Sequence, residues 1–295
     1  MRHLAISDTI GDILGHPEFA GFAPLILPWD GRAYDAKPPI MQIGTLLPYH
    51  SHVIPQDVLG GLNRMIEDVR GGRQVFYRIY SDRQTLADTT QARAGLFFFR
   101  GKPGAPFAVI APGGGFAYVG SVHEGFPYAL DIAANGYNAF VIRYRAGLGG
   151  ETATRDMAAA ISFILSNAGD LEVSADSYAV WGSSAGARMA AAIGTRGVAA
   201  YGGSDVAKPQ VVVMAYTSHS DYGANEPPTF AVVGENDAIA PPSAMRRRIE
   251  ALRRQGTMVE YKECRGLGHG FGRGTGTSAD GWIVEAVGFW ERTMR

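Results

Sequence analysis

Along most of the chain, short apolar runs alternate with longer segments in which apolar residues recur every three or four positions. The short runs are typical of buried strands, and the longer segments are typical of helices that cover a sheet. The pattern predicts strands at 75–80, 96–100, 107–111, 139–144, 178–181, 211–216, 229–233 and 258–264. It also predicts a helix that Asp57 caps and the Gly71-Gly72 pair ends. Further helices are predicted at 126–135, 154–168 and 185–193, around Met245, Ile249 and Leu252, and at 278–294.

This alternation predicts an α/β fold with a mostly parallel central sheet and helices on both faces. The turn at residues 101–104 is short, so we expect strands 96–100 and 107–111 to be antiparallel neighbours. In sheets of this type, ligands bind beyond the carboxyl ends of the strands. Each candidate motif described below falls at such an end.

Residues 1–55 lack this regularity and form an N-terminal extension ahead of a main domain at 56–295. The extension combines many Pro and Gly residues with aromatic residues, namely Phe19, Phe22, Trp29, Tyr34 and Tyr49. Aromatic rings gain stability from packing, which argues against simple disorder. We expect the extension to form a rim or cap of the active site or a contact in a homo-oligomer, with plain packing on one sheet face as the alternative.

Composition narrows the classes of function. The 295 residues suffice for one large α/β domain, and 27 Lys and Arg nearly balance 28 Asp and Glu. No nucleic-acid or membrane partner is therefore indicated, and a neutral small molecule suits this balance better. The single cysteine, Cys264, cannot form an intrachain disulfide, and Asp8 and Asp12 interrupt any signal-peptide core. The protein is expected to be cytoplasmic.

The main candidate for chemistry lies at residues 178–189, which predict a strand, a sharp turn and a helix. Residues 182–186 read Gly-Ser-Ser-Ala-Gly and fit the pattern G-x-S-x-G. This pattern describes a nucleophile elbow, in which a strained turn exposes the hydroxyl of Ser184. The amide of Ala185 at the start of the helix would then stabilise an oxyanion formed at Ser184. A purely structural turn is the alternative reading.

A second motif follows the strand at 107–111, where residues 112–116 read Pro-Gly-Gly-Gly-Phe. Consecutive glycines let the backbone approach a substrate closely and point its amides at it. A second oxyanion donor is expected in this loop, which assigns that role to Gly114 or Gly115. A flexible loop without function is the alternative.

Two further side chains complete a hydrolase set. Asp237 follows the strand at 229–233, where a carboxylate can orient an imidazole; Glu235 is the fallback, and a helix-capping role near Pro241 is the alternative. His269 lies in a glycine-rich loop after the final strand, and His219 precedes Asp237 and so has the wrong order. The order Ser, Asp, His is that of α/β hydrolases.

Other candidates carry less weight. Cys264 lies in a predicted strand, so a cysteine nucleophile is disfavoured. His50 and His52 have no third metal ligand at a recognisable spacing and are expected to be solvent-exposed loop residues. The triple glycine lacks a dinucleotide or phosphate fingerprint. The pair His123-Glu124 follows the glycine loop and is read equally as lining the pocket or as starting a helix.

Four elements carry a resemblance to a known family: Pro-Gly-Gly-Gly-Phe at 112–116, Gly-Ser-Ser-Ala-Gly at 182–186, Gly-Glu-Asn-Asp at 234–237 and Gly-His-Gly-Phe-Gly at 268–272. Together they resemble those of bacterial esterase/lipase proteins of the α/β-hydrolase superfamily, including relatives of acetyl-xylan esterases. The resemblance covers residues 75–295; Pro112 stands where many lipase-like relatives have His, and residues 1–55 match no part of the pattern. It implies a cofactor-free and metal-free serine carboxylesterase that acts on a small ester, with Ser184, Asp237 and His269 as the triad. The alternatives are an amidase, peptidase or acyltransferase with the same triad, or an inactive binding protein on this fold.

Overall fold

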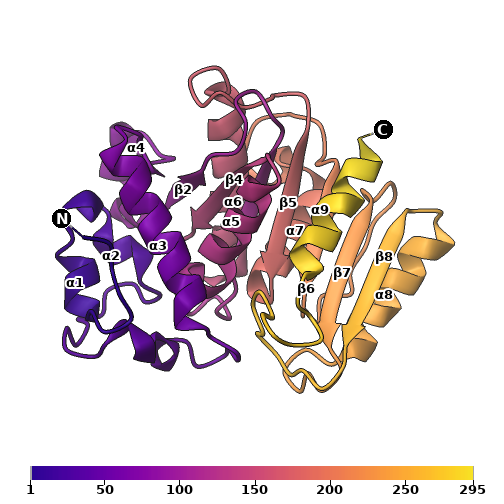
Figure 1. Ribbon diagram of the computed structural model, residues 1–295. Helices are drawn as coiled ribbons and strands as arrows, with labels where there is room; N and C mark the ends of the chain where they lie inside the picture. Colours follow the sequence, from indigo (N-terminus) through magenta and orange to yellow (C-terminus); the bar gives the residue numbers. More distant parts are fainter. Residues whose placement is uncertain (1, 295) are drawn as a thin grey trace.

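The computed structural model describes residues 2–294, which are built around a twisted eight-stranded sheet (Figure 1). The strand order is β1-β2-β4-β3-β5-β6-β7-β8. The strands β3 to β8 run parallel to one another, whereas β1 and β2 are antiparallel to their neighbours. Their bounds are β1 Phe76–Tyr77, β2 Gly95–Phe99, β3 Phe107–Ala111, β4 Asn138–Arg143, β5 Tyr178–Ser183, β6 Val211–Ala215, β7 Thr229–Gly234 and β8 Val259–Cys264.

Helices cover both faces of the sheet, as predicted (Figure 1). On one face, α5 (Phe126–Ala134) packs between α3 (Pro55–Arg70) and α9 (Trp282–Thr293). On the other face, α6 (Gly149–Ser166) packs against α7 (Ala185–Arg196), and α8 (Pro242–Arg254) packs on β7 and β8. Every residue of β2 to β7 is buried, which explains why their sequences are continuous apolar runs. Short helices complete the chain, namely α1 Ile10–Leu14, η1 Pro17–Phe19, α2 Ala23–Ile26, η2 Ile40–Leu46, α4 Asp82–Ala87, η3 Thr89–Arg93, η4 Ser121–Gly125 and η5 Ala199–Tyr201.

Two details of the predicted fold are wrong. The strands β2 and β3 are not neighbours, because β4 lies between them and pairs with both. The turn that joins β2 and β3 crosses the end of β4, where a Cβ atom on Gly101 would lie 2.3 Å from the carbonyl oxygen of Tyr137. Asp57 does not cap α3, which begins at Pro55; its carboxylate instead accepts hydrogen bonds from Arg273 and Thr275.

The N-terminal segment packs into the body of the protein through the four short elements α1, η1, α2 and η2. Its buried apolar side chains are continuous with the main hydrophobic core, and they include Ile13, Phe19 and Ile26. Polar contacts add to this packing, since the buried guanidinium of Arg143 donates to the carbonyl oxygen of Pro28. This segment therefore packs against the body of the protein, and its role at the active site or in an assembly stays a prediction.

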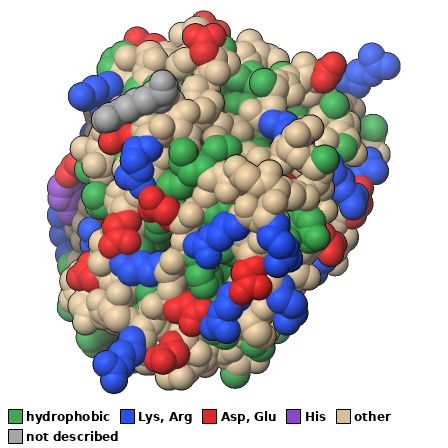
Figure 2. Space-filling model, turned by 90° about the vertical axis from the view of Figure 1, so that its right-hand side faces the viewer, with side chains coloured by type: hydrophobic (Ala, Val, Ile, Leu, Met, Phe, Trp, Pro, Cys, Tyr) green, Lys and Arg blue, Asp and Glu red, His purple; other side chains and the backbone are tan. Residues whose placement is uncertain are grey.

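Charges of both signs mix on the surface at the β8 and α8 end of the molecule (Figure 2). Several of them form ion pairs, including Arg246 with Glu263 and Lys262 with Glu285. This mixing agrees with the balanced composition. None of the helices between residues 2 and 294 is long and apolar enough to cross a bilayer.

Candidate active site

Ser184 lies on a strained turn between the end of β5 and the start of α7. Its backbone has φ 50° and ψ −115°, a conformation that is uncommon for a residue with a side chain. The amide of Ser184 donates to the carbonyl oxygen of Ala215 on the neighbouring strand, which holds the turn in place. The sharp turn between strand and helix predicted from residues 182–186 is thus present.

Glycine is required at Gly186 because the helix passes very close to β3. A Cβ atom there would lie 1.9 Å from the carbonyl oxygen of Ala111. The same close approach brings the loop after β3 next to the elbow, so that a Cβ on Gly113 would lie 2.9 Å from the Cβ of Ser184. The two glycine motifs of the sequence therefore meet at the carboxyl edge of the sheet.

The side chains of Ser184, His269 and Asp237 form a hydrogen-bonded chain. The Nε2 atom of His269 lies 2.9 Å from the Oγ atom of Ser184, and its Nδ1 atom lies 2.8 Å from Oδ2 of Asp237. The Asp237 carboxylate is buried, and its other oxygen accepts hydrogen bonds from the amides of Ile239 and Ala240. This arrangement holds the imidazole with one nitrogen facing the hydroxyl, as proton transfer from Ser184 requires.

The other acid and histidine candidates lie elsewhere. Glu235, the fallback acid, is exposed and accepts a hydrogen bond from the amide of Gly266. Asp237 does not cap α8, whose N-cap is Pro241, so its bonds to amides belong to the loop before that helix. His219 lines a separate cavity described below.

The glycine loop supplies amides that face no protein acceptor. Within residues 2–294, the amide nitrogens of Gly114 and Gly115 form no hydrogen bond. Ala185 is the first residue of α7, so its amide has no acceptor within the helix. Gly114 has a φ of 130°, and a Cβ there would lie 2.2 Å from the carbonyl oxygen of Tyr118, so a side chain does not fit. These amides are available to hold negative charge beside Ser184.

A buried network behind the glycine loop was not foreseen. Oε2 of Glu124 accepts the amide hydrogen of Gly113, and Oε1 accepts hydrogen bonds from the Tyr216 hydroxyl at 2.7 Å and from Nε2 of His50 at 3.0 Å. Burial alone would raise the pKa of Glu124, but His50, His123 and the Tyr216 hydrogen bond lower it to about 2. Glu124 is therefore a buried carboxylate that holds the loop carrying Gly114 and Gly115.

The expectation that His50 is a solvent-exposed loop residue is wrong. Its side chain is only 2% exposed, whereas His52 is exposed as expected. The pair His123-Glu124 does not line the pocket at Ser184. Both residues are buried in η4, the helical turn that runs directly into α5, so the helix-start reading is confirmed. A carboxylate that follows a glycine loop by about ten positions, together with an unassigned histidine, was the only sequence signal for this network.

Two adjoining cavities lie at this edge of the sheet. A small one of about 190 Å³ is lined by Ser184, His269 and Gly115 among others. A larger one of about 610 Å³ begins beside it and shares Phe116 and Arg188 with it. A substrate bound at Ser184 therefore has room to extend in one direction.

The remaining candidate nucleophile is not activated. Cys264 is buried at the end of β8, and burial raises the pKa of its thiol to about 11, which disfavours the reactive thiolate. In the part of the chain that the structure describes, no group of three or more His, Cys, Asp or Glu side chains is placed to hold a metal ion. Ser184 is thus the side chain whose geometry favours nucleophilic attack.

Part of the chain is similar to a known family of sequences. Residues 100–206 match the BD-FAE family, and this stretch contains both the glycine loop and the elbow. It ends before Asp237 and His269. A search of curated proteins gave no match.

Solved structures share the architecture at low sequence identity. MGS-M1, an α/β hydrolase from a Medee basin deep-sea metagenome library, is 24% identical, with a TM-score of 0.57 over 68% of this chain and 92% of that chain. The propionate-bound esterase Est2 of the Planctomycetes species Thermogutta terrifontis is 20% identical, with a TM-score of 0.60 over 68% and 89%. An acetyl ester-xyloside bifunctional hydrolase from Caldicellulosiruptor lactoaceticus is 18% identical, with a TM-score of 0.63 over 74% and 95%. The protein therefore has the α/β-hydrolase fold.

Proposed function

We propose that the protein is a serine esterase that hydrolyses small carboxylic esters through an acyl-enzyme intermediate. The observation that carries this proposal is the chain of hydrogen bonds from Ser184 through His269 to the buried Asp237. The fold, the amides beside Ser184 and the esterases among its structural neighbours support it. One of these neighbours, Est2 of Thermogutta terrifontis, has been solved after phosphonylation by cyclosarin, a reaction that fits an activated nucleophile in that protein.

In the proposed mechanism, Nε2 of His269 takes the proton of the Ser184 hydroxyl while the Ser184 oxygen attacks the ester carbonyl. The amides of Ala185 and of Gly114 or Gly115 then hold the oxyanion. Asp237 orients the imidazole and stabilises its protonated form without itself taking the proton. His269 next donates this proton to the alcohol that leaves. A water molecule then gives a proton to His269 and attacks the acyl group, and the proton returns to Ser184 as the acid is released.

The test combines covalent labelling with hydrolysis of 4-nitrophenyl acetate. A fluorophosphonate is expected to label Ser184 of the wild-type protein, and the site can be mapped by peptide mass spectrometry. Ser184→Ala should abolish labelling and reduce kcat by about 10⁴-fold or more. The matched control is Ser183→Ala, which should cost far less, because the Ser183 hydroxyl is fully buried and contacts the Tyr128 hydroxyl at 3.1 Å.

The result has two informative outcomes. Labelling of Ser184 with loss of turnover only in Ser184→Ala supports the proposed mechanism. A wild-type protein that is folded but neither labelled nor active would instead favour a binding protein that uses this fold without catalysis.

A further inference from the structure

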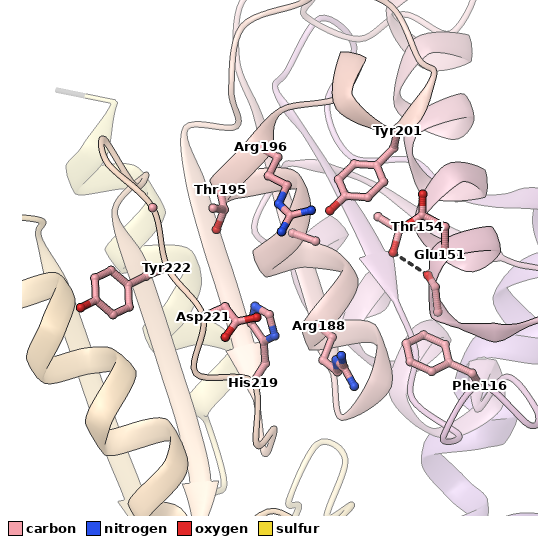
Figure 3. A pocket seen from close by; sticks show the side chains of 13 residues that line it. Phe116, Glu151, Thr154, Arg188, Thr195, Arg196, Tyr201, His219, Asp221 and Tyr222 are labelled. Carbon is pink, nitrogen blue, oxygen red and sulfur yellow. Dashed lines mark hydrogen bonds between the residues drawn. The ribbon is translucent and has the colours of Figure 1, made fainter.

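One face of α7, the helix that begins directly after Ser184, lines the larger cavity of about 610 Å³ (Figure 3). Four residues of this helix line that cavity, and their spacing of four, three and one positions places them on a single face: Arg188, Ala192, Thr195 and Arg196. Arg188 lies one helical turn beyond Ser184 and also lines the small cavity. Arg196 lies about 12 Å further along the helix, from a rise of about 1.5 Å per residue.

The two arginines in this cavity are not neutralised by the protein. Arg188 and Arg196 are exposed, and neither forms an ion pair or a hydrogen bond with any residue between 2 and 294. Figure 3 shows the Arg188 side chain between His219 on one wall and Phe116 on the other, and the Arg196 guanidinium beside Tyr201. Unpaired guanidiniums on the wall of a cavity are well suited to bind planar anions.

One of the two acidic residues of the same cavity is already paired with a cation. Glu151 forms an ion pair of 3.2 Å with Arg155, which does not line the cavity. The other, Asp221, contacts Arg248 only through its backbone carbonyl, because the Arg248 guanidinium pairs with Glu226, so the Asp221 carboxylate forms no ion pair with a residue between 2 and 294. The two arginines of α7 therefore exceed the one unpaired carboxylate of the cavity by one positive charge. The two carboxylates on the walls still disfavour a doubly charged group such as a phosphate monoester.

The rest of the lining is polar enough for a hydroxylated ligand. The hydroxyl of Tyr201 and the ring of His219 face the cavity. Burial, together with the nearby Arg248 and Arg188, lowers the pKa of His219 to about 4, so its ring is neutral at pH 7 and can both donate and accept. The volume of this cavity falls in the range of small-molecule sites, and its lining combines four charged side chains with several hydrogen-bonding groups, which suits a polar ligand.

We propose that this cavity is the subsite for a branch of the ester that bears a carboxylate, with Arg188 as its first binding group and Arg196 available to a longer branch. This inference rests on the proposed function and names the substrate class of the same site. The carboxylate can belong to the acyl part, as in a dicarboxylic half ester, or to the alcohol part, as in an acetylated sugar acid. In both cases it lies about one helical turn from the reacting carbonyl.

The experiment compares esters that differ only in the carboxylate. For the acyl arm, kcat/KM is measured for the 4-nitrophenyl half ester of glutaric acid and for 4-nitrophenyl valerate. For the alcohol arm, acetate release is measured from acetylated glucuronic acid and from acetylated glucose. The wild-type protein is expected to prefer the anionic ester by about tenfold in one arm, the effect of one charge-assisted hydrogen bond, and less so at high salt.

Three variants locate the effect. Arg188→Gln should bring the ratio of anionic to neutral kcat/KM close to one, and the use of a ratio cancels any loss common to both esters. Arg196→Gln should lower the ratio only for anions on longer branches. The matched control is Arg254→Gln, which removes the same charge from the exposed end of α8 and should leave the ratio unchanged.

The outcomes separate this inference from the esterase proposal. If neutral esters are hydrolysed and the ratio is near one in both arms, the subsite inference is wrong and the esterase proposal stands. If no ester is hydrolysed, the esterase proposal fails, and calorimetry of glutarate and valerate with the wild-type protein then tests the cavity. Equal affinity for the two acids, or a preference for glutarate that survives Arg188→Gln, overturns the subsite.

Discussion

Replacing Glu124 by glutamine tests whether the buried carboxylate positions the glycine loop. Three donors converge on the two carboxylate oxygens, namely the amide of Gly113, the hydroxyl of Tyr216 and Nε2 of His50. A glutamine has one acceptor oxygen, so its amino group must face at least one of these donors. Because the site is fully buried, water cannot replace the lost hydrogen bond.

The magnitude follows from this loss. The change removes one charge-assisted hydrogen bond and leaves the glutamine amino group facing another donor. Together these effects should lower the free energy of unfolding by about 3 kcal/mol. With an unfolding entropy of about 2.1 cal/mol/K per residue over 295 residues, Tm should fall by about 5 °C. The amides of Gly114 and Gly115 lose their support at the same time, so kcat should fall by about 10- to 100-fold, with KM for small neutral esters little changed.

The assay is thermal unfolding together with steady-state hydrolysis of 4-nitrophenyl acetate, well below the Tm of the variant. Glu250→Gln is the matched control, because Glu250 is exposed on the outer side of α8. The double variant with His50→Gln should lose less than the sum of the single losses, since both act on one network. A Glu124→Gln protein with lowered Tm but unchanged kcat per folded molecule would refute the positioning role and leave a purely structural one.

Three further changes test other parts of the site. Asp237→Asn should reduce kcat by about 10⁴-fold because the imidazole loses its orienting carboxylate, whereas Glu235→Gln should have little effect; the reverse order in the same assay would exchange the two roles. Burial lowers the pKa of His123 from 6.5 to about 4, so the unfolded state binds more protons than the folded state between these two pH values. The free energy of unfolding should therefore fall by up to about 3 kcal/mol as the pH drops through that window. The variant His123→Gln should flatten this part of a curve of Tm against pH. Ser51→Ala removes the 2.7 Å hydrogen bond to the carbonyl oxygen of His269 and should lower kcat several-fold at a cost of about 1 kcal/mol in stability; an unchanged kcat would show that the backbone alone holds this loop.

The sequence predicted best those elements whose whole length is buried. The strand predicted at 107–111 coincides with β3, and the one at 211–216 exceeds β6 by a single residue. Such strands are unbroken apolar runs because helices cover them on both faces. At the edge of the sheet the pattern weakens, and of the strand predicted at 75–80 only Phe76–Tyr77 pairs with β2.

The candidate site was predictable in so far as each group sits in its own local motif. The elbow, the glycine loop and the residues after β7 and β8 can each be recognised by glycines at a strand end. The partners of Glu124 have no such local motif, because His50 and Tyr216 lie 74 and 92 residues away in the chain. The order of β2, β4 and β3 failed for the same reason, since a strand inserted between two others leaves no mark on the turn that joins them.

The N-terminal segment both packs into the core and contacts the candidate site. Its first part is anchored by apolar side chains in the core, and its end reaches both loops of the candidate site: His50 contacts Glu124 behind the glycine loop, and Ser51 bonds to the loop of His269. Tyr49 stacks on Tyr118 and lies beside Gly115. Core packing and support of the site are therefore not competing roles for this segment. The anchored part fixes where residues 49–51 stand, and these residues contact both the glycine loop with its support and the loop of His269.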